Sequence, residues 1–240
     1  DLRSANLEGA NLAGAELSES LLMNIKGNSS TSFSNANLYR ADLTEAYLGN
    51  ADLMGASLNH TDLTRAVLVL ADLSGAYLVY ADLTGAYLIG ADLTGANLGN
   101  ADLMDADLYQ ADLTNAYLRY ADLTNAYLHS SDLTDADFSY ADLSGAVLIL
   151  ADMTDTSLPY ADLSGASLRF TDLEHVSLYS ADLTDADLSD ADLMDVDLRY
   201  ANLRFANFLD AEHDSPTDWD NAYWHQTIWT DGNRYDTPQA

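Results

Sequence analysis

Apolar residues recur at every fifth position along almost the whole chain, with polar residues between them. Leucines from Leu7 to Leu22 begin the series, which lapses across "MNIKGNSSTS" and resumes one residue out of phase at Phe33. It then continues to Phe208, and Ala or a small substitute such as Thr61 stands two residues before each apolar position. Helices repeat every 3.6 residues and strands every 2, so neither would keep positions five apart on one side.

A coil built from a whole number of five-residue sides would turn every one of these apolar residues inward. Strand alternation then directs the residues that flank each Leu outward, and places the small residue near a corner. Successive coils would stack through backbone hydrogen bonds about 4.8 Å apart, each covering its neighbour's apolar face. The pattern therefore predicts a solenoid.

The stretch "ADLSGAYLVYADLTGAYLIGADLTG" (71–95) resembles the A(D/N)LXX repeat of the pentapeptide-repeat family. The match covers roughly residues 1–24 and 31–210. The resemblance implies an all-β fold, a right-handed quadrilateral parallel β-helix with about twenty residues per coil and about ten coils in this chain. We expect residues 1–210 to form this β-helix and residues 211–240 to form a C-terminal cap.

The segment 23–30 changes the register of the repeat by one residue. A loop or bulge that absorbs the extra residue explains the change, and a recognition loop is the alternative. Lys26, the single lysine of the chain, lies in this segment.

The repeat stops in the sequence after Asp210, and other signals follow it. Ser215 is a good N-cap and Pro216 follows it, which predicts a short helix from about 216 to 225. We expect this cap to cover the open end of the Leu core with its tryptophans, which are Trp219, Trp224 and Trp229. An end-to-end dimer contact is the alternative, and the family resemblance supports it, because members with antibiotic-resistance activity dimerise in this way.

A ten-residue rhythm in the polar positions distinguishes the four sides. With four sides of five residues, positions twenty apart stack in one column and positions ten apart lie on opposite faces. Asp precedes the apolar position at every tenth residue, which predicts two acidic columns. The candidate mimicry positions in them are Asp42, Asp62, Asp82, Asp102 and Asp122 in one, and Asp52, Asp72, Asp92, Asp112 and Asp132 in the other. Gly and Asn at the corners of these faces, as at Gly75 and Asn115, predict type II turns.

The two remaining faces carry large outward apolar and aromatic residues. One face presents Tyr80, Tyr120, Tyr140 and Tyr160 in a single column, and the opposite face presents Val67, Val69, Leu70, Tyr87, Ile89, Tyr109, Tyr127, Val147 and Ile149. Bulky residues disfavour positive φ, so we expect a different turn at these corners. Aromatic and β-branched ladders stabilise stacked strands, and contiguous apolar patches also mark interaction sites. These residues are the candidate partner surface.

The formal net charge of -30 excludes nucleic acid and anionic membranes as simple electrostatic partners, because their phosphates would be repelled. The 48% content of hydrophobic residues argues against disorder. No apolar run reaches the ~18 residues that a membrane span needs. The compartment stays open between the cytoplasm and, if Asp1 is a mature N-terminus, an exported location.

Candidate catalytic and metal-binding patterns are weak. The three His of the repeat region fall on different faces or distant coils, and the spacing of His213 and His225 is not that of a metal site. The chain has no Cys, no phosphate-binding loop and no dinucleotide fingerprint. We therefore expect no enzymatic activity, no cofactor and no metal.

Two functions remain. The first is a structural or protein-interaction rod that presents its acidic and Tyr/aliphatic faces to a protein partner, for which the charge favours a basic protein. A homodimer through the C-terminal end or an apolar face belongs to this hypothesis. The alternative is a DNA mimic that regulates a DNA-binding enzyme, since a rod with lines of carboxylates has the charge sign of a duplex. The resemblance supports it, because quinolone-resistance members of the family bind DNA gyrase in this way.

Overall fold

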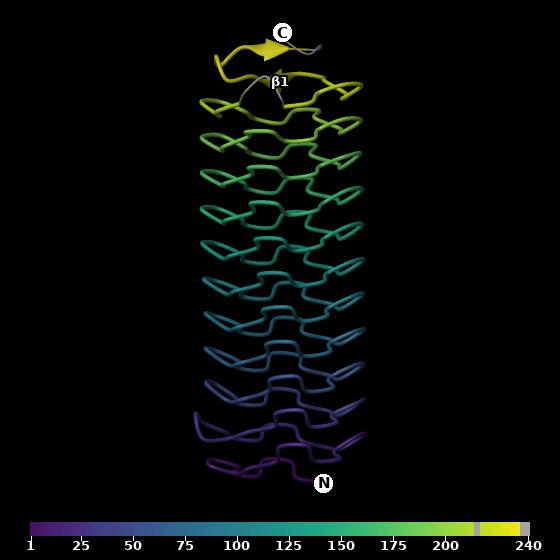
Figure 1. Ribbon diagram of the computed structural model, residues 1–240, viewed down its shortest axis with the longest axis vertical. Coiled ribbons are helices and arrows are strands. Elements are labelled where there is room, and N and C mark those ends of the chain that lie inside the picture. The colour runs from purple at the N-terminus through teal and green to yellow at the C-terminus, as the bar shows by residue number, and fades with distance from the viewer. Residues whose placement is uncertain (214–216, 236–240) are drawn as a thin grey trace.

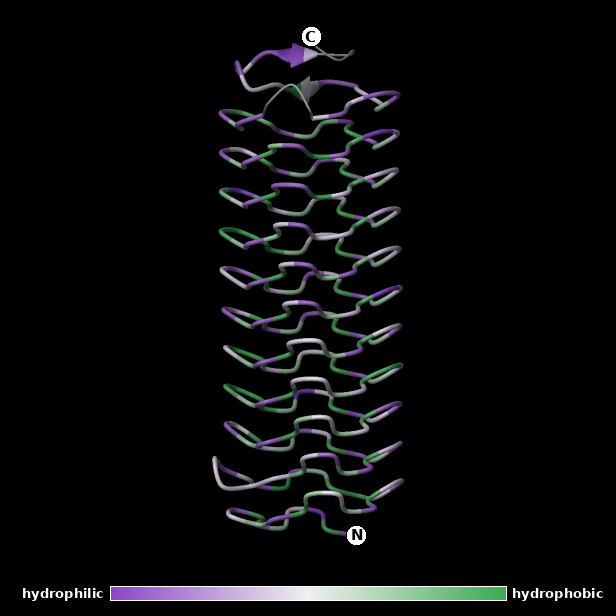
Figure 2. Ribbon diagram, viewed as in Figure 1, coloured by the Kyte–Doolittle hydropathy of each residue, from purple (hydrophilic) through white to green (hydrophobic). Residues whose placement is uncertain are grey.

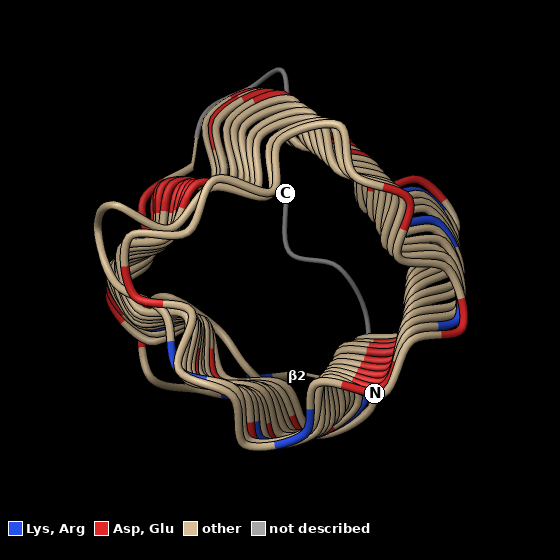
Figure 3. Ribbon diagram, turned by 90° about the horizontal axis from the view of Figure 1, so that it is seen from below, with Lys and Arg blue, Asp and Glu red and all other residues tan. Residues whose placement is uncertain are grey.

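A computed structural model describes residues 1–213 and 217–235 of the chain. The backbone winds as a straight stack of coils, and its outline in end view has four sides (Figures 1 and 3). Parallel bridges join residues twenty apart, as from Asp42 to Asp62 and on to Asp82. The architecture is the expected right-handed quadrilateral parallel β-helix. Each side contributes isolated bridges because only a short part of its five residues is extended before the next corner.

The core is a continuous column of Leu and Ala side chains inside the coils. Leu43, Leu123 and Leu203 are fully buried, as are Phe33 and Phe208, which take the same inward position. Each buried Leu contributes about 2 kcal/mol through the removal of its surface from water, before the loss of entropy is subtracted. Figure 2 shows hydrophobic residues recurring in every coil along the stack.

Hydroxyl residues at the Ala position keep their polar atoms satisfied. Thr61 donates its Oγ1 hydrogen to the carbonyl of Leu38 at 2.7 Å, and Thr156 donates to Leu133 at 2.8 Å. Both Thr side chains are buried. These bonds explain how a polar residue replaces Ala in the wall of the core without leaving an unpaired buried group.

All four corners of a coil have the same turn. The Ala N–H donates to the carbonyl of the Leu three residues before it, and the third residue of the turn has positive φ, which is the requirement of a type II turn. The φ angle is 62° at Gly75, and it is also positive at Leu70 (57°) and Tyr140 (62°). The prediction of a different turn at the bulky corners was wrong. At a corner the backbone N–H donates to a carbonyl of the next coil, as Tyr140 N–H does to Pro159 O at 3.0 Å. This shared hydrogen-bond geometry outweighs the preference of a bulky residue for negative φ.

The extra residue near the N-terminus is absorbed between Lys26 and Ser32. Bridges before this segment join residues twenty apart (Asn6 to Lys26), and the next one joins Asn11 to Ser32. The Asn28 side chain accepts the N–H of Gly9 from the preceding coil at 3.2 Å. The side chain therefore takes over the inter-coil bond that a regular corner makes through its backbone.

The winding continues beyond Asp210, and the predicted C-terminal helix is wrong for the described residues 217–225. Asp218 bridges to Asp197, Tyr223 to Asn202 and Ile228 to Asn207, so this segment adds further sides to the stack. Ser215 and Pro216, which suggested the helix, lie outside the described residues. Strand β1 (Thr227–Ile228) then pairs antiparallel with strand β2 (Arg234–Tyr235), which lies at the C-terminal end of the stack (Figure 1).

Candidate interaction surfaces

Two acidic columns lie on opposite sides of the rod. One, which we call the first Asp face, contains the bridged series that begins at Asp42, and the second Asp face contains the series that begins at Asp52. Acidic residues stack on opposite sides of the outline when the rod is viewed from its end (Figure 3). All ten predicted mimicry positions fall in these two columns.

Each Asp of these columns fixes the turn that follows it. The Asp82 Oδ1 accepts the backbone N–H of Thr84 at 2.9 Å, and the Asp112 Oδ1 accepts that of Thr114 at 2.9 Å. Asn97 makes the same bond to Gly99 at 3.2 Å, and Asn202 to Arg204 at 3.4 Å. This bond therefore needs an acceptor oxygen and does not need a charge.

The Tyr face is a ladder of rings along one corner. Tyr120, Tyr140 and Tyr160 stack with centroids 5.0 and 4.9 Å apart and nearly parallel planes. Tyr80 stacks on His60 at 5.1 Å, in a separate part of the same column. Desolvation raises the pKa of Tyr160 above its usual value, and the neighbouring Tyr179 and Tyr140 raise it further. The ring faces of this column are thus already used between coils.

The sequence-based list of this face missed two members of the ladder. His60 contacts both Tyr39 and Tyr80, and Tyr179 contacts Tyr160 and Tyr200 edge to face. Tyr179 precedes the corner position, which Ser180 occupies in this coil, and its ring still contacts the corner ring of Tyr160. Comparison of positions nineteen to twenty-one apart would have found both.

The opposite face, which we call the aliphatic face, exposes apolar side chains. The exposed fractions of Leu70 and Leu150 are 59% and 54%, and those of Tyr87, Tyr127 and Phe170 are between 46% and 53%. The predicted residues of this face lie in three columns. The first column contains Val67, Tyr87, Tyr127 and Val147, the second contains Val69, Ile89, Tyr109 and Ile149, and the third contains Leu70. Leu70 and Leu150 have positive φ, as the corner tyrosines do, and both are exposed.

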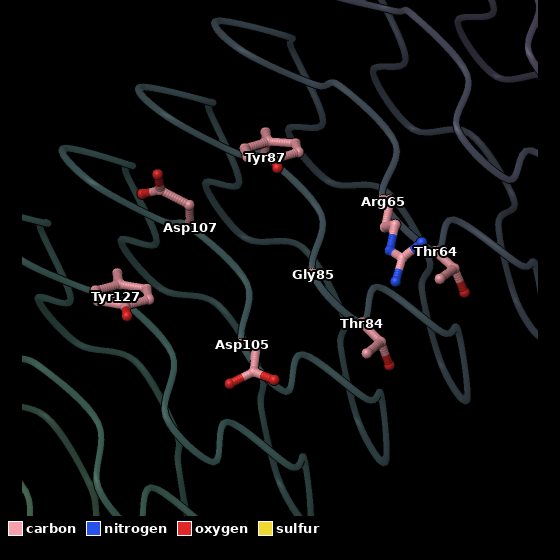
Figure 4. Close-up of a pocket in the computed structure, with 8 residues that line it drawn as sticks. All are labelled: Thr64, Arg65, Thr84, Gly85, Tyr87, Asp105, Asp107 and Tyr127. Atoms are coloured by element: carbon pink, nitrogen blue, oxygen red, sulfur yellow. The ribbon is translucent and has the colours of Figure 1, made fainter.

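A depression of about 430 Å³ opens between the first Asp face and the aliphatic face. Asp107 lies between Tyr87 and Tyr127 along one wall, and Arg65, Gly85 and Asp105 lie along the other (Figure 4). Asp107 and Gly85 are smaller than the Tyr87 and Tyr127 that line the same depression. Sequence reasoning did not find it, because its two walls come from neighbouring sides of the coil.

The three tryptophans occupy inward positions of the last coil, where other coils have Leu. Trp219, Trp224 and Trp229 lie beyond Leu198, Leu203 and Phe208, and Trp224 and Trp229 are buried. Their rings contact one another at 5.0 to 5.5 Å, and each contacts the Phe208 ring. The sequence does carry this signal, because a small residue stands two positions before each Trp, as it does before each Leu.

Basic residues are few, and two of those toward the C-terminal end, Arg199 and His175, lie beside carboxylates. The Arg199 Nη2 contacts Asp197 Oδ2 at 2.7 Å, and its Nε lies 3.5 Å from Asp218 Oδ2. The hydrogen bond from Arg199 lowers the pKa of Asp197, and Asp197 in turn raises that of Arg199. His175 lies within 3.4 to 3.8 Å of Asp155, Glu174 and Asp195.

Within residues 1–213 and 217–235, no group of three or more His, Asp or Glu side chains has an arrangement that could hold a metal ion. In the same part of the chain, no helix is long and apolar enough to cross a membrane.

A family model for pentapeptide repeats matches the chain in eight copies. The copies cover residues 1–24, 31–68, 71–110, 111–148, 131–169, 148–185, 161–199 and 177–211. No curated protein sequence matches the chain.

Solved structures of similar proteins come from several organisms. HetL, a pentapeptide repeat protein involved in heterocyst differentiation regulation from the cyanobacterium Nostoc sp. strain PCC 7120, is 32% identical, with 95% of this chain and 92% of that chain covered and a TM-score of 0.45. Full-length QnrB1, a plasmid-mediated fluoroquinolone resistance protein, is 19% identical, with 88% and 92% covered and a TM-score of 0.43. Rfr23, from the cyanobacterium Cyanothece 51142, is 25% identical, with 56% and 91% covered and a TM-score of 0.38.

Proposed function

The chain belongs to the pentapeptide-repeat family, and from this premise we propose that it is a non-enzymatic rod that binds a protein partner through its Tyr and aliphatic faces. The observation that carries the proposal is the exposure of large apolar side chains at corners where φ is positive. Leu70 and Leu150 are each more than half exposed at such corners. A residue other than Gly or Asn in this conformation costs about 1 kcal/mol.

The charge distribution supports a protein partner on these faces. Most carboxylates of the repeat lie in the two Asp columns and their corners, and the faces between them carry few charges up to Phe170. Along the aliphatic face from Ala66 to Phe170, the charged residues are Asp107 and Arg169, whose charges cancel. A neutral, partly apolar surface loses little solvation when a protein covers it.

The experiment is affinity capture with the full chain as bait and three matched variants. One variant carries Val69→Ser and Ile89→Ser on the aliphatic face, one carries Tyr120→Ser and Tyr140→Ser on the Tyr face, and one carries Asp102→Asn and Asp122→Asn on the first Asp face. We expect the wild type to capture a protein that the first or second variant loses and the Asp variant keeps. Loss in the Asp variant alone, or equal capture by all four baits, would contradict the proposal.

A DNA-mimic regulator is the second candidate function, and one observation favours it. Asn97 and Asn202 make the turn bond that the column Asp residues make, so the repeated choice of Asp adds charge that the fold does not require. Carboxylates about 4.8 Å apart repel one another by close to 1 kcal/mol per pair in water, a cost that a functional negative potential would offset. In a DNA gyrase supercoiling assay, a mimic should inhibit the enzyme, and the Asp→Asn variant should not. Absence of inhibition by the wild-type rod at high concentration would exclude this role for gyrase.

A further inference from the structure

The outward residues of six successive coils on the aliphatic face form one continuous strip. Its three columns are Val67, Tyr87, Asp107, Tyr127, Val147 and Ser167, then Val69, Ile89, Tyr109, His129, Ile149 and Arg169, and Leu70, Gly90, Gln110, Ser130, Leu150 and Phe170. Apolar residues dominate the coils of Leu68, Leu88 and Leu148, and polar residues are concentrated in the two middle coils and at Ser167 and Arg169. We propose that this strip binds the same strip of a second copy of the chain, with the two rods side by side and antiparallel. This inference rests on the proposed function and names its partner.

The order of residues in the strip is self-complementary under a twofold rotation. When two identical faces meet with their rods antiparallel, each column faces its own copy in reverse order. With the axis between the coils of Leu108 and Leu128, Leu70 faces Phe170 of the second copy and Ile89 faces Ile149. Both contacts are apolar, and each occurs twice.

Large residues meet small ones in the same register. Asp107, in the hollow between Tyr87 and Tyr127 (Figure 4), faces Tyr127 of the second copy, whose hydroxyl can donate to the carboxylate. Leu150 faces Gly90, where the Leu70 Cδ2 lies 2.8 Å from the position that a Cβ would take, so Leu150 would contact the Leu70 side chain there. The hollow thus has an occupant in this register, and Leu150 adds an apolar contact.

The charges select the antiparallel arrangement over the parallel one. In a parallel pair, each coil meets the same coil of the second copy, so the next coil would bring Asp187 and Asp190 of both copies together, which is unfavourable. In the antiparallel pair, Arg169 faces Val69, and Asp187 and Asp190 face Tyr47 and Asn50. Like charges therefore separate only when the rods run in opposite directions.

The Tyr face does not offer an equivalent surface. Its rings stack on one another along the rod, so their faces are already covered. Its tyrosine corners are symmetric about Tyr140, and the corresponding twofold axis would place the two copies of Asp137 against each other. The aliphatic face has one ring contact along the rod, between Tyr109 and His129 at 5.5 Å, and its twofold axis brings no pair of like charges together.

The size of the strip sets the expected strength. Six coils span about 29 Å, and five-residue sides are about 16 Å wide, so the pair covers roughly 1,000–1,200 Å² in total, at the lower end of specific interfaces. Two rods with a charge of -30 each also repel at long range. We therefore expect a dissociation constant on the order of micromolar that falls when salt screens the charge.

The first experiment is sedimentation of the full chain from about 1 to 200 µM at about 0.15 and 0.5 M NaCl. We expect a monomer–dimer equilibrium that shifts toward dimer in higher salt. The variant with Leu70→Ser and Leu150→Ser should raise the dissociation constant about tenfold or more. The control carries Tyr80→Ser and Tyr160→Ser, which replace two corner residues of the same positive φ on the opposite face, and should dimerise as the wild type does.

The second experiment fixes the orientation by spin labels, for which the absence of native Cys is useful. In the antiparallel dimer, labels at Gln110→Cys lie about one coil apart along the rods, and labels at Asn50→Cys lie seven coils or about 34 Å apart. A parallel dimer would bring both pairs of labels close together. Any of three results overturns the inference. They are label distances that indicate a parallel dimer, a wild-type chain that stays monomeric at all concentrations, and an equal loss of dimer in the control variant.

The two proposals fail in different ways. A monomeric wild type that still captures another protein, and loses it with Val69→Ser and Ile89→Ser, would remove the homodimer and leave the interaction rod. A dimer whose affinity is unchanged by Leu70→Ser and Leu150→Ser would remove this strip as the contact.

Discussion

The Oδ1 of Asp122 accepts the backbone N–H of Thr124 at 2.9 Å, and the same bond recurs through both acidic columns. Because this bond needs an oxygen and not a charge, Asn should replace Asp in the fold. We expect the variant with Asp102→Asn, Asp122→Asn and Asp142→Asn to be at least as stable as the wild type, since repulsion of about 1 kcal/mol or less per neighbouring pair is removed. Urea unfolding at low and high salt measures this, and the variant should also depend less on salt.

The matched control removes the acceptor as well as the charge. Asp122→Ala leaves the Thr124 N–H without its partner and should lower the free energy of unfolding by about 0.5–2 kcal/mol. Equal losses for Asn and Ala would show that the charge itself stabilises the rod, and would weaken the case for a functional negative potential.

The corners of the two neutral faces should respond in opposite directions to the same substitution. Leu70→Asn relieves about 1 kcal/mol of backbone strain at a position with φ of 57° and should stabilise the monomer. Tyr140→Asn relieves similar strain and also removes two stacked contacts of about 0.5–1.5 kcal/mol each, so it should be neutral or destabilising. Thermal unfolding of dilute protein separates the two, and stabilisation by both would mean that the ring ladder contributes little.

The repeat pattern predicted the coil correctly because burial alone determines it. Leu at every fifth position with a small residue two before it leaves no other side for these residues to face. The corner at Leu70 was predicted wrongly because the φ of a corner is set by the closure of the coil and by hydrogen bonds to its neighbours. Residue preferences act on one corner at a time and are weaker than these shared constraints.

The C-terminal segment was predicted wrongly because two local signals conflicted. Ser215 and Pro216 favour a helix start, whereas Thr217, Ala222 and Thr227 continue the small-residue period of the repeat with Trp in place of Leu. The hydroxyls of Thr217 and Thr227 donate to the carbonyls of Leu193 and Leu203 at 2.7 and 2.6 Å, as Thr61 does to Leu38. Long-range stacking on an existing coil thus prevailed over a short helix signal.

The sequence predicted which residues share a column on the surface, and it did not predict the shape of that surface. Positions twenty apart placed Tyr80, Val67 and Asp42 on their faces from the sequence alone. The hollow at Asp107 depends on residues from two sides of the coil, including Gly85, and on the angle at the corner between them. That angle comes from the turn geometry, which the sequence pattern did not give.

The indole N–H of Trp224 is buried without a hydrogen-bond partner among the described residues. An unpaired buried donor costs about 1–3 kcal/mol, so Trp224→Phe should change stability by no more than about 1 kcal/mol, because the removed N–H offsets the lost contact area. Trp224→Ala empties the position against Phe208 and should cost about 3–5 kcal/mol. Chemical denaturation followed by circular dichroism compares the two, and a large loss for Phe would indicate that the N–H has a partner in solution.

Asp197 should link stability to pH through its contact with Arg199. The hydrogen bond from the guanidinium holds the pKa of Asp197 below its ordinary value of 3.8, so the folded state binds this proton less tightly than the unfolded state. The resulting stabilisation is present above pH 3.8 and is lost as the pH falls through the lower folded pKa. Arg199→Gln should return the pKa of Asp197 toward its ordinary value in an NMR titration of its carboxyl carbon, and Arg204→Gln should leave it unchanged. A pKa that does not move in Arg199→Gln would contradict this linkage, because the backbone N–H of residue 199 would then account for the shift alone.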